Sequence, residues 1–235
     1  MRIVVTRPQV DGKRTATMLE MLGHEVLVAP LMRVDPVAAD LGGTWSAFTI
    51  TSANAVQAIA GNSTILAQRK LPLFAVGKRS AEAARQAGFD DVISANGDVD
   101  DLVRLIAARV VGAKAPLLYL AGENLAADLV ALLRAQGVNA EMRIVYRAVA
   151  EPFPAVLAAA LEAGDVDAVL HFSRRSAELF VEGARTAGVA DQALDVRHLC
   201  LSVQVAEALV GATRINIAQR PDEEALIALL ETFPA

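Results

Sequence analysis

Six segments rich in hydroxyl, glycine and basic residues each follow an apolar run of the chain. A serine, threonine or glycine in such a place is, taken alone, a typical N-cap of a helix. The whole set is better suited to anion binding, because helix N-termini and arginine side chains both hold carboxylates. The sequence therefore predicts a surface for a large ligand with several separate acid groups. The segments are Thr6-Arg7-Pro8, Thr51-Ser52-Ala53-Asn54, Gly77-Lys78-Arg79-Ser80, Gly122-Glu123-Asn124, Ser173-Arg174-Arg175-Ser176 and Ser202-Val203-Gln204.

Other familiar chemistries lack their sequence patterns. Neither G-x-G-x-x-G after the first apolar run nor G-x-x-x-x-G-K-[ST] occurs, so nucleotide binding is not predicted. The histidines at positions 24, 171 and 198 are scattered and Cys200 is the single cysteine, which excludes the usual zinc templates. No G-x-S-x-G elbow is present, which argues against a serine hydrolase. No metal or cofactor is expected. We expect Cys200 to be buried in the core and His171 to be a core or edge residue with one hydrogen bond.

Composition limits the class of protein. Of the 235 residues, 54% are hydrophobic and 21% are charged, which predicts a real core and argues against disorder. Aromatic residues make up 4% and the formal net charge is −5, so nucleic-acid binding is not predicted. No apolar run reaches membrane-spanning length, and the N-terminal run is too short for a signal peptide. These features predict a cytoplasmic protein that does not contact a membrane.

Short apolar, strand-like runs alternate with amphipathic stretches throughout the chain. This alternation is typical of βα units on a mostly parallel sheet. The ten runs equal the strands of two flavodoxin-like sheets, so the predicted fold class is α/β with two doubly wound lobes. The runs are residues 3–6, 25–29, 47–51, 73–76, 91–94, 117–121, 141–145, 168–172, 198–202 and 214–218.

Helical patterns lie between these runs. They include residues 12–22, 80–87, 100–110, 125–136, 176–187, 204–209 and 222–230. Several end at a glycine, as a left-handed C-cap requires a residue without Cβ. These glycines are Gly23, Gly88, Gly137, Gly188 and Gly211.

The second half of the chain repeats the first. Residues 3–7 resemble 118–122, and the helix ends Gly23 and Gly137 differ by 114 positions. Residues 48–52 resemble 169–173 at an offset of 121, and residues 73–76 resemble 199–202. Such self-similarity predicts two copies of one five-stranded unit.

Two proline-bearing extended segments, residues 30–37 and 146–154, lie at equivalent places in the repeats and are interpreted as linkers. If both cross between lobes, lobe one is discontinuous and consists of residues 1–35 and 150–235. Lobe two is then residues 36–149, including the linkers. The periodicity alone leaves open two sequential domains divided near residue 115.

Five motifs occur in a fixed order over nearly the whole chain. They are Ile3-Val4-Val5-Thr6-Arg7-Pro8, Phe48-Thr49-Ile50-Thr51-Ser52-Ala53-Asn54-Ala55-Val56, Ala75-Val76-Gly77-Lys78-Arg79-Ser80-Ala81, Val145-Tyr146-Arg147 and Phe172-Ser173-Arg174-Arg175-Ser176. No single motif is specific, but the ordered set resembles the uroporphyrinogen-III synthase family. The resemblance implies two flavodoxin-like lobes joined by two extended strands, with the active site in the cleft between the lobes.

The resemblance also implies an enzyme. A member of the family is a lyase that, without a cofactor, cyclises the linear tetrapyrrole hydroxymethylbilane to uroporphyrinogen III, a precursor of haem, sirohaem and cobalamin. Loss of the hydroxyl gives an azafulvene cation, and attack at the substituted carbon of ring D gives a spiro intermediate. Fragmentation and recombination then complete the inversion of ring D. A monomer is expected, and a transient contact with hydroxymethylbilane synthase is left open.

The family's site residues can be carried over to matching positions. The catalytic tyrosine corresponds to Tyr146, whose phenol would donate a proton or hydrogen bond to the departing hydroxyl; the alternative is a packing residue of the linker. Many members have a threonine where Val205 stands, so that role is lost or passes to Ser202 or Gln204. The implied substrate-binding residues are Thr6, Arg7, Thr51, Ser52, Ala53, Gly77, Lys78, Arg79, Ser80, Gly122, Asn124, Ser173, Arg174 and Ser202.

The main alternative from another class is a two-lobed small-molecule protein that binds an anionic ligand without turnover. Exported binders carry a signal peptide and regulators a helix-turn-helix segment, and neither pattern is found in the sequence. A phosphoacceptor receiver is disfavoured, because Thr6-Arg7-Pro8 stands where its acidic cluster belongs.

Overall fold

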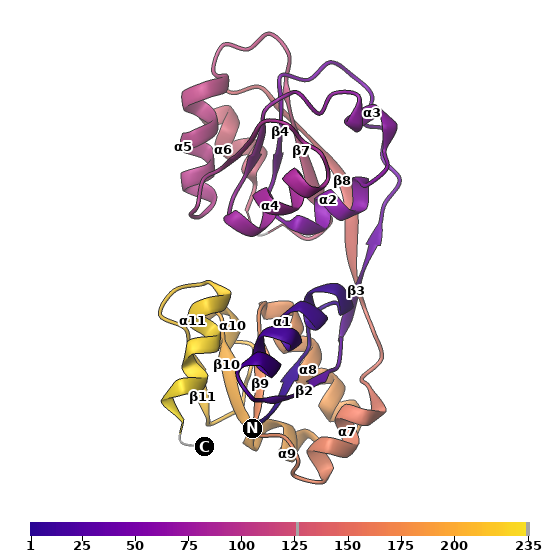
Figure 1. Cartoon of the computed structure of the whole chain (residues 1–235), viewed down its shortest axis with the longest axis vertical. Coiled ribbons are helices and arrows are strands. Elements are labelled where there is room, and N and C mark those ends of the chain that lie inside the picture. Colours follow the sequence, from indigo (N-terminus) through magenta and orange to yellow (C-terminus); the bar gives the residue numbers. More distant parts are fainter. Residues whose placement is uncertain (126, 234–235) are drawn as a thin grey trace. The chain divides into compact units, whose positions relative to one another are not determined.

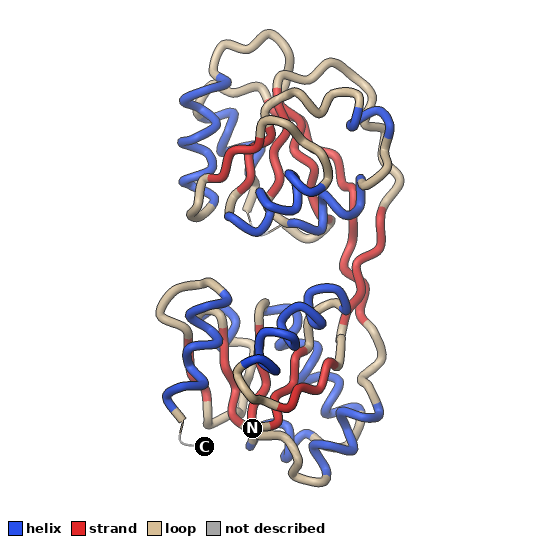
Figure 2. The backbone as a smooth tube through the Cα atoms, viewed as in Figure 1, coloured by secondary structure: helices blue, strands red, loops and turns tan. Residues whose placement is uncertain are grey.

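The computed structural model describes residues 1–125 and 127–233. The chain divides into two compact units, of which unit 1 consists of Met1–Arg33 and Val149–Ala235 and unit 2 of Val34–Ala148 (Figure 1). Each unit is built around a sheet with helices on both faces (Figure 2), which confirms the predicted α/β fold class. Among the described residues, no helix is long and apolar enough to cross a membrane.

The sheet of unit 1 is parallel and has five strands in the order β11-β10-β9-β1-β2. Ile3 and Val5 pack with residues of α1 and α11 on one face, whereas Val4 packs with α7, α8 and α9 on the other. Burial on both faces explains the continuous apolar runs. The strands are β1 (Arg2–Val5), β2 (Glu25–Val28), β9 (Ala168–His171), β10 (Arg197–Cys200) and β11 (Ile215–Ile217). The helices are α1 (Gln9–Met21), α7 (Ala155–Glu162), α8 (Arg174–Thr186), α9 (Ala190–Asp195), α10 (Val203–Ala206), α11 (Glu223–Ala228) and the 3-10 helix η1 (Leu229–Thr232).

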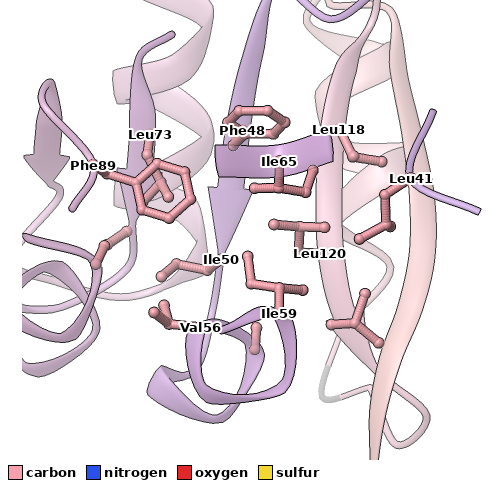
Figure 3. Packing of buried hydrophobic residues seen from close by; sticks show 14 of the residues in the cluster. Leu41, Phe48, Ile50, Val56, Ile59, Ile65, Leu73, Phe89, Leu118 and Leu120 are labelled. Carbon is pink, nitrogen blue, oxygen red and sulfur yellow. The ribbon is translucent and has the colours of Figure 1, made fainter. Parts of the chain in front are cut away.

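Unit 2 contains a six-stranded sheet in the order β3-β8-β7-β4-β5-β6. Phe48 and Ile50 pack with residues of α2, α3 and α4 in one core (Figure 3), whereas Ala47 packs with residues of α5 and α6 on the opposite face. The strands are β3 (Met32–Pro36), β4 (Ala47–Ile50), β5 (Leu73–Ala75), β6 (Val92–Ser94), β7 (Leu117–Gly122) and β8 (Ala140–Ala150). The helices are α2 (Ala53–Ile59), α3 (Ser63–Leu66), α4 (Lys78–Gln86), α5 (Val99–Val110) and α6 (Leu129–Ala135).

The two extended segments expected as linkers contain regular strands. β3 forms much of the first, and β8 runs without interruption from Ala140 to Ala150. Tyr146 therefore lies inside a long strand rather than at the start of a linker. Its carbonyl accepts a hydrogen bond from the backbone N–H of Glu123 at 3.0 Å, which anchors this part of β8 to the end of β7.

Strand register confirms the internal repeat and corrects its alignment. β1 pairs with β9 through Ile3 and Ala168, and β7 pairs with β4 through Leu117 and Ala47. The offset of 121 relates Ala47 to Ala168, so Ile3 corresponds to Leu117 at the helix offset of 114. The sequence match of residues 3–7 with 118–122 is thus shifted by one residue from the structural alignment. Such a slip would move every side chain to the other face of the sheet.

Four of the five predicted glycine ends coincide with helix ends, but α10 already ends at Ala206, before Gly211. Two helix starts differ from their predictions by three residues or more, since α1 begins at Gln9 and α6 begins late. The five glycines predicted to end helices all have positive φ, between 76° and 96°. α6 begins at Leu129, with the Asp128 carboxylate accepting from the Ala131 N–H at 3.0 Å. The predicted helix began at residue 125, and its residue 126 lies outside the described residues.

Two buried histidines take the place of aliphatic core residues in unit 1. His171 on β9 and His198 on β10 are fully buried, and His171 Nε2 lies 3.0 Å from His198 Nδ1. Both rings pack against Phe180, with centroids 5.3 and 5.9 Å away. By strand register the equivalent residues of unit 2 are Ile50 and Leu73, which belong to its apolar core. The prediction that His171 is a core residue with one hydrogen bond is confirmed.

Burial sets the ionisation of these side chains. Desolvation, followed by the neighbouring His198, lowers the pKa of His171 well below its usual value. Desolvation also lowers the pKa of His198 to about 4, although the backbone of Ala193 and Leu194 acts in the opposite direction. Cys200 is buried as predicted, and desolvation raises the pKa of its thiol to about 12.

We predict that the histidine pair makes unit 1 less stable as the pH falls below 6.5, the usual histidine pKa. Both rings are neutral in the folded unit and bind protons on unfolding, so their contribution is full above that pH. It decreases toward pH 4 by up to about 1.4 kcal/mol per pH unit for each histidine. Hydrogen exchange of β9 and β10 amides between pH 7.5 and 5 measures this slope.

The double variant His171→Ile/His198→Leu, which copies unit 2, should have a flatter slope in the same strands. Trp45, the single tryptophan, lies buried in unit 2, and its fluorescence transition should be the same in both proteins. An unchanged slope in β9 and β10 of the double variant would contradict the prediction.

Candidate active site

The candidate residues of unit 2 lie where parallel strands end and helices begin. Thr51 and Ser52 follow β4, Gly77 follows β5, and Gly122 is the last residue of β7. Because the carboxyl ends of parallel strands share one edge of a sheet, the unit gathers these residues there. Tyr146 reaches the same edge because β8 pairs with β7 at Gly122. The residues from the predicted set in this unit are Thr51, Ser52, Ala53, Gly77, Lys78, Arg79, Ser80, Gly122, Asn124 and Tyr146.

Tyr146 packs directly against the backbone of Gly122. The two residues are paired across a register irregularity between Ala121 and Gly122. A Cβ built on Gly122 would lie 2.5 Å from Tyr146 Cζ and 2.7 Å from its hydroxyl oxygen. The glycine is therefore required by this close approach, which brings the phenol over the end of β7.

The Tyr146 phenol is a proton donor at neutral pH. The side chain is half-buried, and desolvation raises its pKa above the usual value, while a hydrogen bond with Ser52 acts in the opposite direction. A neutral phenol can donate a hydrogen bond or a proton to a leaving oxygen. The acid role that the sequence predicts for Tyr146 stays a prediction.

Hydroxyl groups line the end of β4. The Ser52 side chain caps α2 by accepting from the Asn54 N–H at 3.2 Å. Thr51 Oγ1 lies 2.9 Å from the hydroxyl of Tyr119, a buried residue of β7. Sequence reasoning did not select Tyr119, although it is one of only two tyrosines in the chain.

The start of α4 presents two cations beside these hydroxyls. Gly77 is the N-cap, and the side chains of Lys78 and Arg79 in the first turn are exposed. Ser80, in the same turn, is buried. The helix N-terminus and the two basic residues together favour an anionic group at this place.

The candidate residues of unit 1 also lie at the carboxyl ends of strands, but two are buried. Thr6 and Arg7 follow β1 and have little exposure, whereas Ser173 and Arg174 after β9 are exposed. Ser173 caps α8 by accepting from the Ser176 N–H at 3.1 Å, and Arg174 bonds to Glu178 at 2.9 Å. The set in this unit is Thr6, Arg7, Ser173, Arg174 and Ser202. Val205 is part of a buried apolar cluster.

Arg7 is held inside unit 1 by acidic partners. Its guanidinium donates to Glu223 at 2.9 Å and to Thr15 at 3.2 Å, and it lies 3.7 Å from Asp11. It also stacks over the Phe172 ring, 4.0 Å from the centroid. Sequence reasoning did not pair Arg7 with Glu223 of α11, because the two residues are far apart in the chain.

Two hollows lie away from these residues. One of about 450 Å³ in unit 2 is lined mainly by apolar residues between Pro36 and Asn62 together with Val145. The other, about 390 Å³ in unit 1, lies near Asp167 and Arg214. Within the described part of the chain, no cluster of three or more histidine, cysteine or acidic residues could hold a metal ion.

The fold and the strand-end residues define an α/β protein built from two flavodoxin-like units. A family model described as uroporphyrinogen-III synthase HemD matches residues 13–228. The chain therefore belongs to the uroporphyrinogen-III synthase family, enzymes of tetrapyrrole biosynthesis.

Solved structures agree with this fold. Uroporphyrinogen-III synthetase from Helicobacter pylori is 17% identical, with 99% of each chain covered and a TM-score of 0.70. A mutant uroporphyrinogen III synthase from the extremely thermophilic bacterium Thermus thermophilus is 19% identical, covers 99% of this chain and 98% of its own, and has a TM-score of 0.59. No curated protein matches the chain in a sequence search.

We predict that Gly122→Ala destabilises unit 2 by about 1–3 kcal/mol, because the added methyl group overlaps the Tyr146 ring. The cost should largely disappear when Tyr146 is also replaced by alanine. Gly77→Ala is the matched control, since a Cβ there meets nothing within 4 Å. Chemical denaturation followed by Trp45 fluorescence measures all of these variants. If Gly122→Ala lowered the free energy of unfolding equally in the wild type and in Tyr146→Ala, the contact would be disproved.

Proposed function

We propose that this chain converts hydroxymethylbilane to uroporphyrinogen III as a lyase, with loss of water and inversion of ring D. The observation that carries the proposal is the family match over residues 13–228. The position of Tyr146 supports it, because a half-buried neutral phenol at the strand-end edge suits removal of a hydroxyl.

In the proposed reaction, Tyr146 donates a proton or hydrogen bond to the hydroxyl that leaves the terminal pyrrole. Its departure as water leaves an azafulvene cation. The substituted carbon of ring D attacks the methylene carbon of this cation, and the new carbon–carbon bond gives a spiro intermediate. Fragmentation and recombination then give the inverted ring. The protein's main contribution is to hold the chain ends together in the geometry that leads to this isomer.

The substrate's carboxylates are proposed to bind the strand-end loops. In unit 2 the exposed Lys78 and Arg79 at the start of α4 supply positive charge, and Thr51 and Ser52 supply hydroxyls. In unit 1 Ser173 and Arg174 are exposed at the start of α8. The remaining proposed contacts are Thr6, Arg7, Ala53, Gly77, Ser80, Gly122, Asn124 and Ser202.

We further propose that the enzyme works without a cofactor, as a cytoplasmic monomer, with a transient contact to hydroxymethylbilane synthase. The instability of a bilane with a good leaving group favours rapid transfer between the two enzymes. The alternative of an anion-binding protein without turnover is not favoured by the family match.

We predict that the purified protein, supplied with freshly generated hydroxymethylbilane, forms mainly uroporphyrinogen III. Oxidation of the product and chromatographic separation of uroporphyrins I and III measures the ratio. Spontaneous closure gives isomer I, so a reaction without protein is the control. Isomer I alone from a folded sample would reject the enzyme and support the binding protein.

We predict that Tyr146→Phe lowers turnover by roughly 10²-fold or more, because general acid catalysis of this kind is worth about 10²–10⁴ in rate. The ring that packs against Gly122 is kept, so Trp45 fluorescence and the unfolding transition should stay as in the wild type. Wild-type turnover in this variant would remove the acid role from Tyr146.

A further inference from the structure

Two adjacent hydroxyl residues at the end of β4 act on the chain's two tyrosines. Thr51 Oγ1 lies 2.9 Å from the Tyr119 hydroxyl, and the Ser52 side chain lowers the pKa of Tyr146 against the effect of burial. The tyrosines pack on opposite faces of the sheet, Tyr119 with the core under α5 and α6 and Tyr146 with the core under α2. Tyr119 therefore approaches the strand-end edge from the interior.

The surroundings of Tyr119 determine the direction of its hydrogen bond. The residue is 3% exposed and its ring packs among apolar side chains, whereas Thr51 is half-buried. Desolvation raises the pKa of Tyr119, so its phenol keeps its proton. The geometry allows either hydroxyl to donate. We assign the donated proton to Tyr119, because a phenol is the more acidic of the two hydroxyls, and Thr51 then accepts. The Thr51 hydroxyl then has its own proton for a second partner.

The fold itself does not need this pair of hydroxyls. By the offsets of the repeat, Val5 of unit 1 corresponds to Tyr119, and Phe172 corresponds to Thr51. At these two equivalent positions of its sheet, unit 1 therefore has apolar side chains. The hydroxyl pair is thus a feature of unit 2, where Tyr146 also lies.

We propose that Tyr119 is a positioning residue that fixes the Thr51 hydroxyl as a hydrogen-bond donor to a carboxylate of the tetrapyrrole substrate. The inference rests on the proposed function. In a chain of hydroxyls each donation strengthens the next donor. Without the phenol, the Thr51 hydroxyl can rotate and donate its hydrogen bond to another acceptor.

Tyr119→Phe tests the proposal because it removes the hydroxyl and keeps the buried ring. We expect the KM for hydroxymethylbilane to rise about 3- to 10-fold, which corresponds to the net contribution of one ordinary hydrogen bond. The kcat should change less than about 2-fold. Thr51→Val should have the same effect, Thr51→Ser should retain the wild-type KM, and the double variant Tyr119→Phe/Thr51→Val should be no worse than either single variant.

Thr49→Val is the matched control. Thr49 lies on the same face of the sheet as Thr51 and is fully buried. Its hydroxyl donates a hydrogen bond to the Phe74 carbonyl at 3.1 Å. Its loss should lower the melting temperature by a few degrees with the KM unchanged. A KM increase in Thr49→Val equal to that of Tyr119→Phe would show a general loss of structure and overturn the proposal.

Other outcomes also decide the question. A wild-type KM in Tyr119→Phe, or multiplying effects in the double variant, would overturn the role of Tyr119. A wild-type KM in Thr51→Val would also overturn the proposal, even if the Tyr119→Phe variant did not fold. If the wild-type protein forms no uroporphyrinogen III, the proposed function fails and the inference with it. An active wild type with an unaffected Tyr119→Phe rejects only the inference.

Discussion

Parallel strand pairing is the constraint on which the arrangement of both units depends. Parallel strands bury apolar side chains on both faces, so helices must cover both faces and each strand must return through a crossover. In unit 2 Phe48 faces one helical layer and Ala47 the other. The same connectivity brings every strand-to-helix loop to one edge. The polar candidate residues collect there because a polar group on a buried face of the sheet would need a hydrogen-bond partner.

The two repeats keep this framework and differ in what they place on it. His171 and His198 occupy core positions that unit 2 fills with Ile50 and Leu73. At the strand-end edge, unit 1 buries Arg7 among acidic partners, whereas unit 2 has tyrosine and threonine hydroxyls. Equal backbone positions thus carry different chemistry, and both tyrosines of the chain are in unit 2.

The fold could be predicted because its signals are local. Each apolar run that ends in a polar loop predicts a buried strand, and all ten predicted strands are present. The glycines that follow helices could also be predicted, since a positive φ excludes most other residues. The exact register between the repeats could not be predicted. Ile3 and Leu117 are equivalent only through their pairing with other strands, and a one-residue shift leaves both sequences equally apolar.

The candidate site was less predictable, because the charge of a residue does not show whether another residue of the fold already neutralises it. Arg7 counts as a cation in the sequence, but Glu223 holds it inside unit 1, and only the fold brings these two residues together. Arg174 likewise bonds to Glu178. Lys78, by contrast, is exposed in the first turn of α4, where the helix N-terminus adds to its charge. The proposed binding of carboxylates by unit 2 therefore rests more on the start of α4 than the distribution of basic residues along the chain indicates.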